Sequence, residues 1–244
     1  MKPVILIPAR MAATRLPGKP LADVGGVPMI VRVLRQAQRA GVGPVAVAAG
    51  DPEIVEAVEA AGGSAILTDP NLSSGSDRIL AALNAMGGDH DVVINLQGDM
   101  PFVEERVLIA CAALLANEPS CDVATVVAPE ASPADRSNPD VVKAVLALKE
   151  GDQAGRALYF TRSTLHGNAP VWRHIGIYGY RRAALEAFTA APPSPLEQRE
   201  KLEQLRGLEL GLSYWAAIAE AAPISVDNPS DLDAARAYAE SLET

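Results

Sequence analysis

The sequence predicts an α/β fold in which a mostly parallel central sheet carries helices on both faces and a smaller mixed-sheet part is added to it. Short apolar runs alternate with helical patterns through the first half of the chain, and this rhythm breaks in a Pro- and Ser-rich stretch at 129–139. The runs are apolar at nearly every position, which is typical of strands buried on both faces of a parallel sheet. Such sheets bind ligands beyond the carboxyl ends of their strands.

Apolar runs at 4–7, 45–49, 65–67, 92–96 and 123–128 predict the strands of the first half. Helical spacing follows each of the first four runs, and three of these helices end at Gly41, Gly62 and Gly87. Asp51 precedes Pro52, which predicts that Asp51 caps the second helix. The first half of the chain therefore predicts strand–helix units with right-handed crossovers.

The second half predicts longer strands at 141–148, 157–161 and 175–180, which would form the mixed sheet. Ser194 and Glu197 have capping-box spacing and predict a helix that runs through Arg206. A last strand is expected at 224–226, and Asn228 is expected to cap the final helix.

Composition limits the possible partners of this chain. Its 244 residues carry a formal net charge of -9, which argues against nonspecific binding to nucleic acid or to an anionic membrane. No transmembrane segment or targeting peptide is visible, and Cys111 and Cys121 lack metal-ligand spacing. The sequence thus predicts a cytoplasmic protein with reduced cysteines.

The first strand leads into a loop that carries Arg10, Arg15 and Lys19, although the protein as a whole is acidic. Arginine offers a planar donor fork and lysine a mobile point charge, so this set suits the oxygens of a polyphosphate. The loop matches neither a Walker loop nor the dinucleotide fingerprint. A solvated basic loop is the alternative interpretation.

Asp99 and Asp227 each follow a predicted strand and are candidate ligands for Mg²⁺, which binds one or two carboxylates together with phosphate oxygens. Asp99 has a simpler interpretation as a turn residue after Gly98, and Asp227 as a charge at a helix N-terminus.

Several other polar residues have both a functional and a structural interpretation. The segment from Ser74 to Arg78 begins a helix and could receive an anion or a base carbonyl there, or simply cap the helix. The histidines lack the spacing of a zinc helix, and His174 could bind a sugar hydroxyl or carboxylate, or be structural. Glu203 has the spacing of a helix ion pair with Arg199 and Arg206.

Taken together, the chain resembles the 3-deoxy-manno-octulosonate (KDO) cytidylyltransferase family over nearly its whole length. The segments that carry the resemblance are IPAR-x₄-RLPGKPL ending at Leu21, PMI at Pro28, EAAGG at Glu59, SGSDR at Ser74, NLQGD-x-P at Asn95, NP-x-VVK at Asn138, ALYF-x-R at Ala157, H-x-GIYGY at His174, PSPLE at Pro193, LEQLR at Leu202 and VDNP-x-DL at Val226. The first of these would also suit other sugar cytidylyltransferases, whereas GIYGY, PSPLE and LEQLR in that order are more specific.

The resemblance implies a Rossmann-like nucleotidyltransferase fold and an Mg²⁺-dependent enzyme that transfers CMP from CTP to KDO for lipopolysaccharide synthesis. It implies a cytoplasmic homodimer. It also implies one domain, residues 1–244, with a nucleotide-binding part to about 128, an added sugar-binding and dimerisation part to about 222, and a return to the main sheet. The site residues that it implies are Pro8, Ala9, Arg10, Arg15, Lys19, Ser76 and Gln97 for the nucleotide, Arg78, Gln97, His174, Tyr180, Glu203 and Gln204 for the sugar, and Asp99 and Asp227 for the metal. A protonated His174 or Arg78 would suit the KDO carboxylate.

This chain departs from the family at three places. Met100 stands where the family usually has an acid, Asn71-Leu72 replaces an expected acid and histidine, and the stretch between Arg162 and Trp172 is shorter than in some members. Two alternatives therefore remain open: a cytidylyltransferase for a related acidic sugar, such as a sialic acid or an amino-KDO, and a non-catalytic nucleotide-binding homologue.

Overall fold

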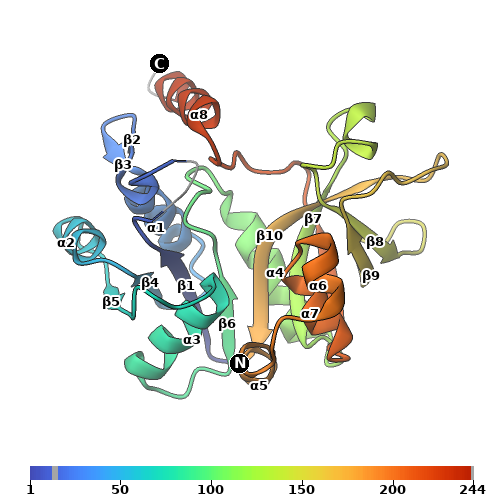
Figure 1. Ribbon diagram of the computed structural model, residues 1–244, viewed down its shortest axis with the longest axis horizontal. Helices are drawn as coiled ribbons and strands as arrows, with labels where there is room; N and C mark the ends of the chain where they lie inside the picture. The colour runs from blue at the N-terminus through green and yellow to red at the C-terminus, as the bar shows by residue number, and fades with distance from the viewer. Residues whose placement is uncertain (13–15, 243–244) are drawn as a thin grey trace. The chain divides into compact units, whose positions relative to one another are not determined.

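The computed structural model describes residues 1–12 and 16–242, and the chain divides into two compact units (Figure 1). The first unit comprises Lys2–His90, Asn95–Leu108 and Pro223–Thr244. The second unit comprises Met1, Asp91–Ile94 and Ile109–Ala222.

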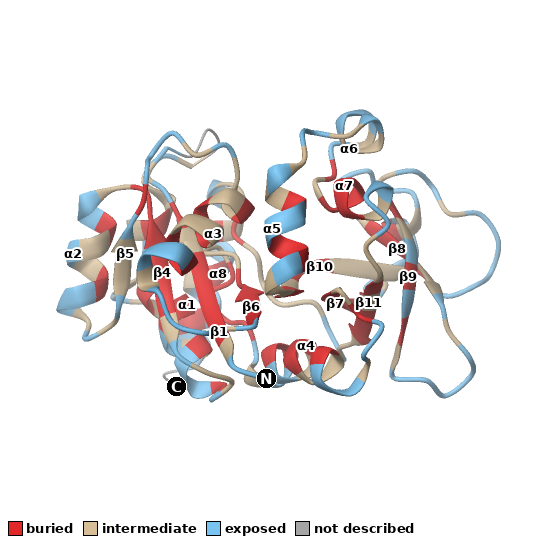
Figure 2. Ribbon diagram, turned by 90° about the horizontal axis from the view of Figure 1, so that it is seen from below, coloured by how far each residue is buried: buried red, intermediate tan, exposed pale blue. Residues whose placement is uncertain are grey.

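The first unit is built on parallel strands in the order β5-β4-β1. Their bounds are Pro3–Ala9 for β1, Val45–Ala49 for β4 and Ala65–Leu67 for β5. Val4 to Ile7 are fully buried at consecutive positions, so both faces of β1 are covered (Figure 2). The predicted parallel sheet is confirmed, and its strands end at one edge.

Helices and short strands complete the first unit: α1 (Met29–Arg39), α2 (Pro52–Ala60), α3 (Gly75–Met86), α8 (Pro229–Ser241), the 3-10 turn η1 (Lys19–Leu21), β2 (Asp23–Val24) and β3 (Val27–Pro28). Helix α1 buries Ile30, Val33, Leu34 and Ala37, as its helical spacing predicts. Ser74 caps α3 by accepting a hydrogen bond from the Asp77 N–H.

Two elements cross the boundary between the units: β6 (Val92–Asn95) and α4 (Glu105–Asn117). Within residues 1–12 and 16–242, no helix is long and apolar enough to span a membrane. Cys111 and Cys121 are both buried, and they are not joined in a disulfide.

The second unit contains a mixed sheet, in the order β6-β10-β7-β11-β9-β8. Its longer strands are β7 (Val123–Pro129), β8 (Lys143–Ala147), β9 (Ala154–Thr161), β10 (Trp172–Arg181) and β11 (Tyr214–Ile218), and it also holds η2 (Pro133–Arg136) and α5 (Arg182–Ala190). β11 runs parallel to β7, whereas β10 is antiparallel to β7 and β9 is antiparallel to both β11 and β8. The predicted α/β class with an added mixed sheet is thereby confirmed.

One prediction for the end of the chain is wrong, and one strand was not predicted. β11 lies in a stretch for which no strand was predicted, and residues 224–226 do not form the expected last strand. The Val226 N–H donates to the Asp99 carbonyl at 2.9 Å, while the Val226 carbonyl accepts from the Lys19 side chain at 3.0 Å. Since the two backbone groups of Val226 bond to a loop and to a side chain and not to a strand, residues 224–226 form a connection outside the sheet.

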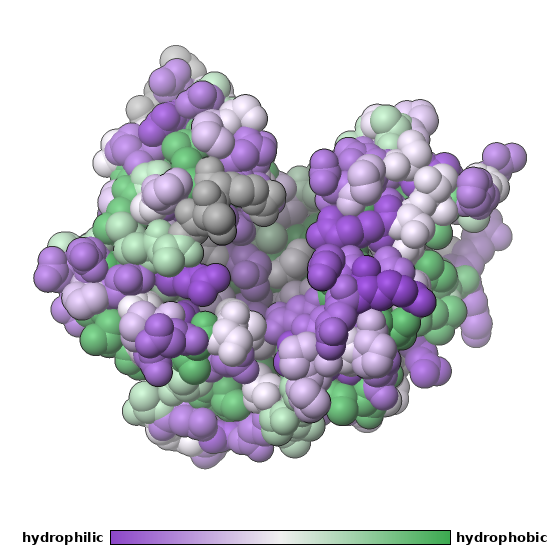
Figure 3. Space-filling model, viewed as in Figure 1, coloured by the Kyte–Doolittle hydropathy of each residue, from purple (hydrophilic) through white to green (hydrophobic). Residues whose placement is uncertain are grey.

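The single helix predicted from Ser194 through Arg206 is in fact two helices, α6 (Pro195–Glu200) and α7 (Gln204–Glu209). The capping box of Ser194 and Glu197 is confirmed, but Lys201 adopts a left-handed φ of 58° and ends α6. Hydrophilic side chains cover α6 on the face shown in Figure 3.

An ion pair between the buried Arg206 and the half-buried Glu197 holds the corner between α6 and α7. Arg206 donates from Nε and Nη2 to the two carboxylate oxygens of Glu197 at 2.8 and 2.7 Å, and the side chains are 9% and 14% exposed. The guanidinium also stacks on the Phe188 ring, 4.7 Å from its centroid. These hydrogen bonds lower the pKa of Glu197 below its ordinary value.

We expect Arg206→Met to lower the free energy of unfolding by about 3 kcal/mol at neutral pH, because it leaves the half-buried Glu197 carboxylate without its main partner. A carboxyl with a lowered folded pKa contributes stability above its unfolded pKa and loses it as the pH falls through the folded value. The difference between the proteins should therefore shrink below about pH 4, as measured by urea unfolding across pH. The control is Arg156→Met, which removes an exposed arginine of the same unit. An equal loss in both variants, or a loss that does not change with pH, would contradict the role of the pair.

Candidate active site

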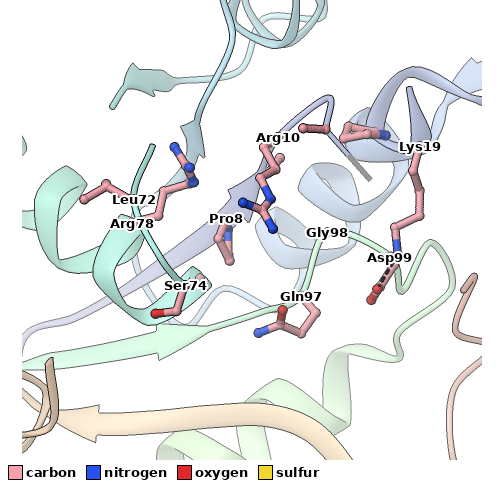
Figure 4. Close-up of a pocket in the computed structure, with 13 residues that line it drawn as sticks. Pro8, Arg10, Lys19, Leu72, Ser74, Arg78, Gln97, Gly98 and Asp99 are labelled. Atoms are coloured by element: carbon pink, nitrogen blue, oxygen red, sulfur yellow. Dashed lines mark hydrogen bonds and ion pairs between the residues drawn. The ribbon is translucent and has the colours of Figure 1, made fainter. Parts of the chain in front are cut away.

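A cavity of about 260 Å³ lies in the first unit, beyond the carboxyl end of β1 (Figure 4). Its lining residues are Pro8, Ala9, Arg10, Ala12, Lys19, Pro20, Leu72, Ser74, Gly75, Arg78, Gln97, Gly98 and Asp99. They come from the end of β1 and the segment after it, from η1, from the loop before α3 and the start of that helix, and from the segment after β6. Predicted nucleotide residues thus share one cavity with a predicted metal ligand. Arg15 lies outside the described residues.

The polar groups that could receive a nucleotide come from two further elements. Ser74 and Gly75 line the cavity at the start of α3, where backbone N–H groups favour an anion. Ser76 itself is buried, at 1% exposed, so the preceding two residues present this helix start to the cavity. The Gln97 amide lines the cavity and donates from Nε2 to Asn95 Oδ1 at 3.1 Å.

Lys19 lies beside both predicted metal ligands: it forms a hydrogen-bonded ion pair with Asp99 and a longer ion pair with Asp227. Its ammonium donates to Asp99 Oδ2 at 2.8 Å and to the Val226 carbonyl at 3.0 Å, and lies 4.0 Å from Asp227 Oδ1. Burial raises the pKa of the Asp99 carboxyl above its ordinary value, while the Lys19 charge opposes this shift. Lys19 thereby compensates a carboxylate that is only 22% exposed.

The same oxygens fit a divalent cation. The Lys19 ammonium already occupies a position that favours positive charge, next to two carboxylates and a carbonyl, and oxygen donors are what Mg²⁺ prefers. Across the described part of the chain, no group of three or more His, Cys, Asp or Glu side chains could hold a metal by itself. A metal at Asp99 and Asp227 would need further ligands from a phosphate or from water.

Arg78 holds the wall of the cavity in place. Its Nη1 donates to Thr68 Oγ1 at 2.6 Å and to the Asp69 carbonyl at 3.0 Å, and Nη2 donates to the Pro70 carbonyl at 3.3 Å. The side chain is buried, at 2% exposed, and burial lowers the pKa of Arg78, with the Arg10 charge lowering it further. The predicted sugar ligand therefore bonds mainly to the loop that leads to Leu72.

Three comparisons identify relatives of this chain. A sequence model of the cytidylyltransferase family matches residues 4–216. The 3-deoxy-manno-octulosonate cytidylyltransferase of Rhodospirillum rubrum is 52% identical over 96% of this chain and 94% of its own, and that of Parvibaculum lavamentivorans is 53% identical over 96% and 92%. A solved structure of CMP:2-keto-3-deoxy-manno-octonic acid synthetase complexed with CTP is 38% identical and has a TM-score of 0.91, with all of both chains covered.

The chain belongs to the 3-deoxy-manno-octulosonate cytidylyltransferase family. The resemblance found in the sequence is thereby confirmed. Two of its departures from that family can be placed in the first unit. Met100 is buried at 6% exposed, so its side chain belongs to the core, while Leu72 lines the cavity.

Four predicted sugar residues belong to the second unit. His174 contacts Thr125 Oγ1 through Nε2 at 2.9 Å and packs against the ring of Phe160, with centroids 4.7 Å apart. Burial lowers the pKa of His174 to about 3. Burial therefore disfavours the protonated form of His174, and its role at a sugar carboxylate stays a prediction.

The other three residues lie in β10 and at the start of α7. Tyr180 is 1% exposed and packs between the rings of Tyr178 and Phe188, so its side chain belongs to the core of the second unit. Glu203 directly precedes α7, and Gln204 begins it and is buried. Their roles at a sugar stay predictions.

Sequence reasoning missed Tyr178, whose ring lies 5.4 Å from that of His174. Burial, together with the nearby charge of Glu203, raises the pKa of this tyrosine. The four-residue spacing of His174 and Tyr178 across a strand was the available signal, since same-face residues of a strand are an even number apart.

We expect the ring proton resonances of His174 to stay constant between pH 5 and pH 8, because a pKa of about 3 keeps the ring neutral throughout. The unfolded chain binds this proton near its ordinary value of 6.5 and the folded chain does not, so acidification below 6.5 lowers the free energy of unfolding. NMR titration of labelled protein measures the first effect, with a histidine peptide as reference. A midpoint between pH 5 and pH 8 would contradict this assignment.

We expect Arg78→Met to lower the free energy of unfolding by about 3 kcal/mol, because it removes the buried partner of three oxygens. Residues 69–72 should also exchange their amide hydrogens faster. Arg78→Lys should not restore protection, since a lysine lacks the planar donor fork. Arg35→Met, which removes an exposed arginine of α1, is the control. Wild-type stability and exchange in Arg78→Met would mean that Arg78 does not hold this loop.

Proposed function

We propose that this protein transfers CMP from CTP to 3-deoxy-manno-octulosonate, releases pyrophosphate, and supplies the activated sugar to lipopolysaccharide synthesis. One observation carries the proposal: a single cavity combines Arg10 and Lys19 with the carboxylate of Asp99. The 38% identity to a synthetase complexed with CTP supports the nucleotide, and the names of the relatives support the sugar.

The reaction forms one P–O bond and breaks another. The anomeric hydroxyl of the sugar attacks the α-phosphorus and loses its proton, while the bond from that phosphorus to the bridging oxygen of pyrophosphate breaks. Negative charge develops on the leaving pyrophosphate. Positioned cations lower this barrier mainly by electrostatics and orientation.

In this proposal, Arg10 and Lys19 neutralise phosphate oxygens, and Arg15 is assigned to them by family resemblance. The nucleotide would be surrounded by Pro8, Ala9, Gln97 and the start of α3, which line the cavity. At the start of α3 the lining residues are Ser74 and Gly75, because Ser76 is buried. Asp99 and Asp227 would hold Mg²⁺, which would polarise the phosphate and stabilise the charge on the leaving group. Met100, which replaces a common acid, leaves these two as the carboxylates of the metal site.

The remaining assignments rest on resemblance to the family. The sugar would be bound by Arg78, Gln97, His174, Tyr180, Glu203 and Gln204, with a neutral His174 acting as a hydrogen-bonding group. Residues at about 129–222 would form the sugar-binding and dimerisation part. The enzyme would act as a cytoplasmic homodimer.

The test is pyrophosphate release from CTP and Mg²⁺ with a panel of acidic sugars: KDO, an amino-KDO and a sialic acid. We expect turnover with KDO to exceed turnover with the others by at least about tenfold, since a site built for particular polar groups rejects sugars that leave them unpaired. Asp99→Asn is the inactive control; it should keep the melting temperature but lose activity by about a hundredfold or more.

Faster turnover of another acidic sugar would show that this sugar, and not KDO, is the substrate. Tight CTP binding with no turnover of any sugar would favour a non-catalytic nucleotide-binding protein. Near-normal activity of Asp99→Asn would remove Asp99 from the metal site.

A further inference from the structure

Asp51 occupies the N-cap position of α2 but does not cap the helix. Its backbone is extended, and its side chain makes no capping hydrogen bond. Instead, Asp51 Oδ2 accepts a hydrogen bond from the Met11 N–H at 2.7 Å. The Asp51 carboxylate thus bonds to a backbone amide 40 residues away and not to the N-terminus of α2. This charge-assisted hydrogen bond stabilises the segment that contains Met11.

Met11 stands at the base of the cation-bearing loop. Its carbonyl accepts the Gly18 N–H at 3.2 Å, so Met11 is bonded to Asp51 on one side and to the returning chain on the other. Arg10 precedes Met11 directly, and Lys19 follows Gly18 directly. One carboxylate thereby fixes the backbone beside both cations.

The neighbouring strand end is tied to the same place. The Gly50 N–H donates to the Ala9 carbonyl at 2.8 Å. A Cβ on Gly50 would lie 2.9 Å from Arg78 Nη1 and 3.2 Å from the Arg10 Cβ, so a larger residue here would force the two arginines to shift. The negative charge of Asp51 also favours the charged form of Arg78.

We infer that Asp51 is a positioning residue for nucleotide binding, which holds Arg10 and Lys19 in place through the Met11 amide. The inference rests on the proposed function for the identity of the ligand. Charge alone would not predict a role for Asp51 in nucleotide binding, because a carboxylate next to a polyphosphate repels it. The hydrogen bond to Met11 directs this carboxylate to the loop instead.

Three substitutions separate the roles that Asp51 could have. Asp51→Asn keeps an oxygen that can accept from Met11 and can cap α2, but removes the charge. Asp51→Ser is a good helix cap, but its oxygen is one bond closer to the backbone and falls short of Met11. Asp51→Ala loses all of these. Ser194→Ala, which removes a genuine capping bond in the second unit, is the matched control for the loss of a cap.

CTP binding and the melting temperature should be measured for each protein by calorimetry. We expect Asp51→Ser and Asp51→Ala to bind CTP about tenfold more weakly, or worse, and Asp51→Asn to bind within about twofold of the unsubstituted protein. Asp51→Ser should keep the melting temperature, and Ser194→Ala should lower it without loss of CTP binding. Wild-type CTP binding by Asp51→Ser or Asp51→Ala, or binding by Asp51→Asn as weak as that of Asp51→Ala, would overturn the inference.

Amide hydrogen exchange separates this inference from the proposed function. Without any nucleotide, the Met11 and Gly18 amides should be protected in the unsubstituted protein and in Asp51→Asn, and exposed in Asp51→Ser and Asp51→Ala. Failure of the unsubstituted protein to bind CTP would overturn the proposed function. Equal exchange of these amides in all four proteins would overturn the positioning role.

Discussion

The parallel strands of the first unit exclude charged side chains, and this constraint determines where a binding or catalytic site can form. β1 and β4 are buried along most of their length, so an ionised group within them would lose its hydration without compensation. Charged side chains enter only where the strands end and the backbones diverge. Arg10 after β1 and Asp51 after β4 follow this rule, and the cavity lies beyond the end of β1.

The backbone groups freed at these strand ends require partners, and the polar side chains supply them. Asp51 accepts from Met11, Arg78 donates to two carbonyls after β5, and Lys19 donates to the Val226 carbonyl. Each bond joins segments that are distant in the chain or connects a loop to a helix. The cavity is therefore a consequence of satisfying backbone groups, and the side chains that shape it need not be those that touch a ligand.

The regular elements of the fold could be predicted because their signals are local. Consecutive apolar residues predicted β4 with its observed bounds, and the spacing of Ile30, Val33, Leu34 and Ala37 predicted the buried face of α1. β11 was missed because its alanines do not distinguish a strand from a helix, and its pairing with β7 and β9 is nonlocal. Residues 224–226 were taken for a strand on composition alone, although their backbone bonds to Asp99 and Lys19.

Site residues were predictable as a set, but their partners were not. Sequence and family resemblance selected Arg10, Lys19, Gln97 and Asp99, which do share one cavity. The same reasoning assigned Arg78 to a sugar, whereas its hydrogen bonds go to the 68–70 loop, and it allowed a charged His174, whose pKa is lowered by burial. Burial and hydrogen-bond partners are tertiary properties, so the residue type alone could not separate a ligand from a residue that positions one.

The ion pair between Lys19 and Asp99 limits which ligands can bind in its place. An anion that attracted Lys19 alone would leave Asp99 unpaired, and a carboxylate that is 22% exposed loses much of its stabilisation when its partner leaves. A cation alone would have to displace the Lys19 ammonium, which would then lose its carboxylate. A ligand that brings a phosphate for Lys19 and a divalent cation for Asp99 compensates both partners at once. If the proposed function holds, the pair would favour a nucleotide together with its metal over either one alone, before any contact with the sugar is made.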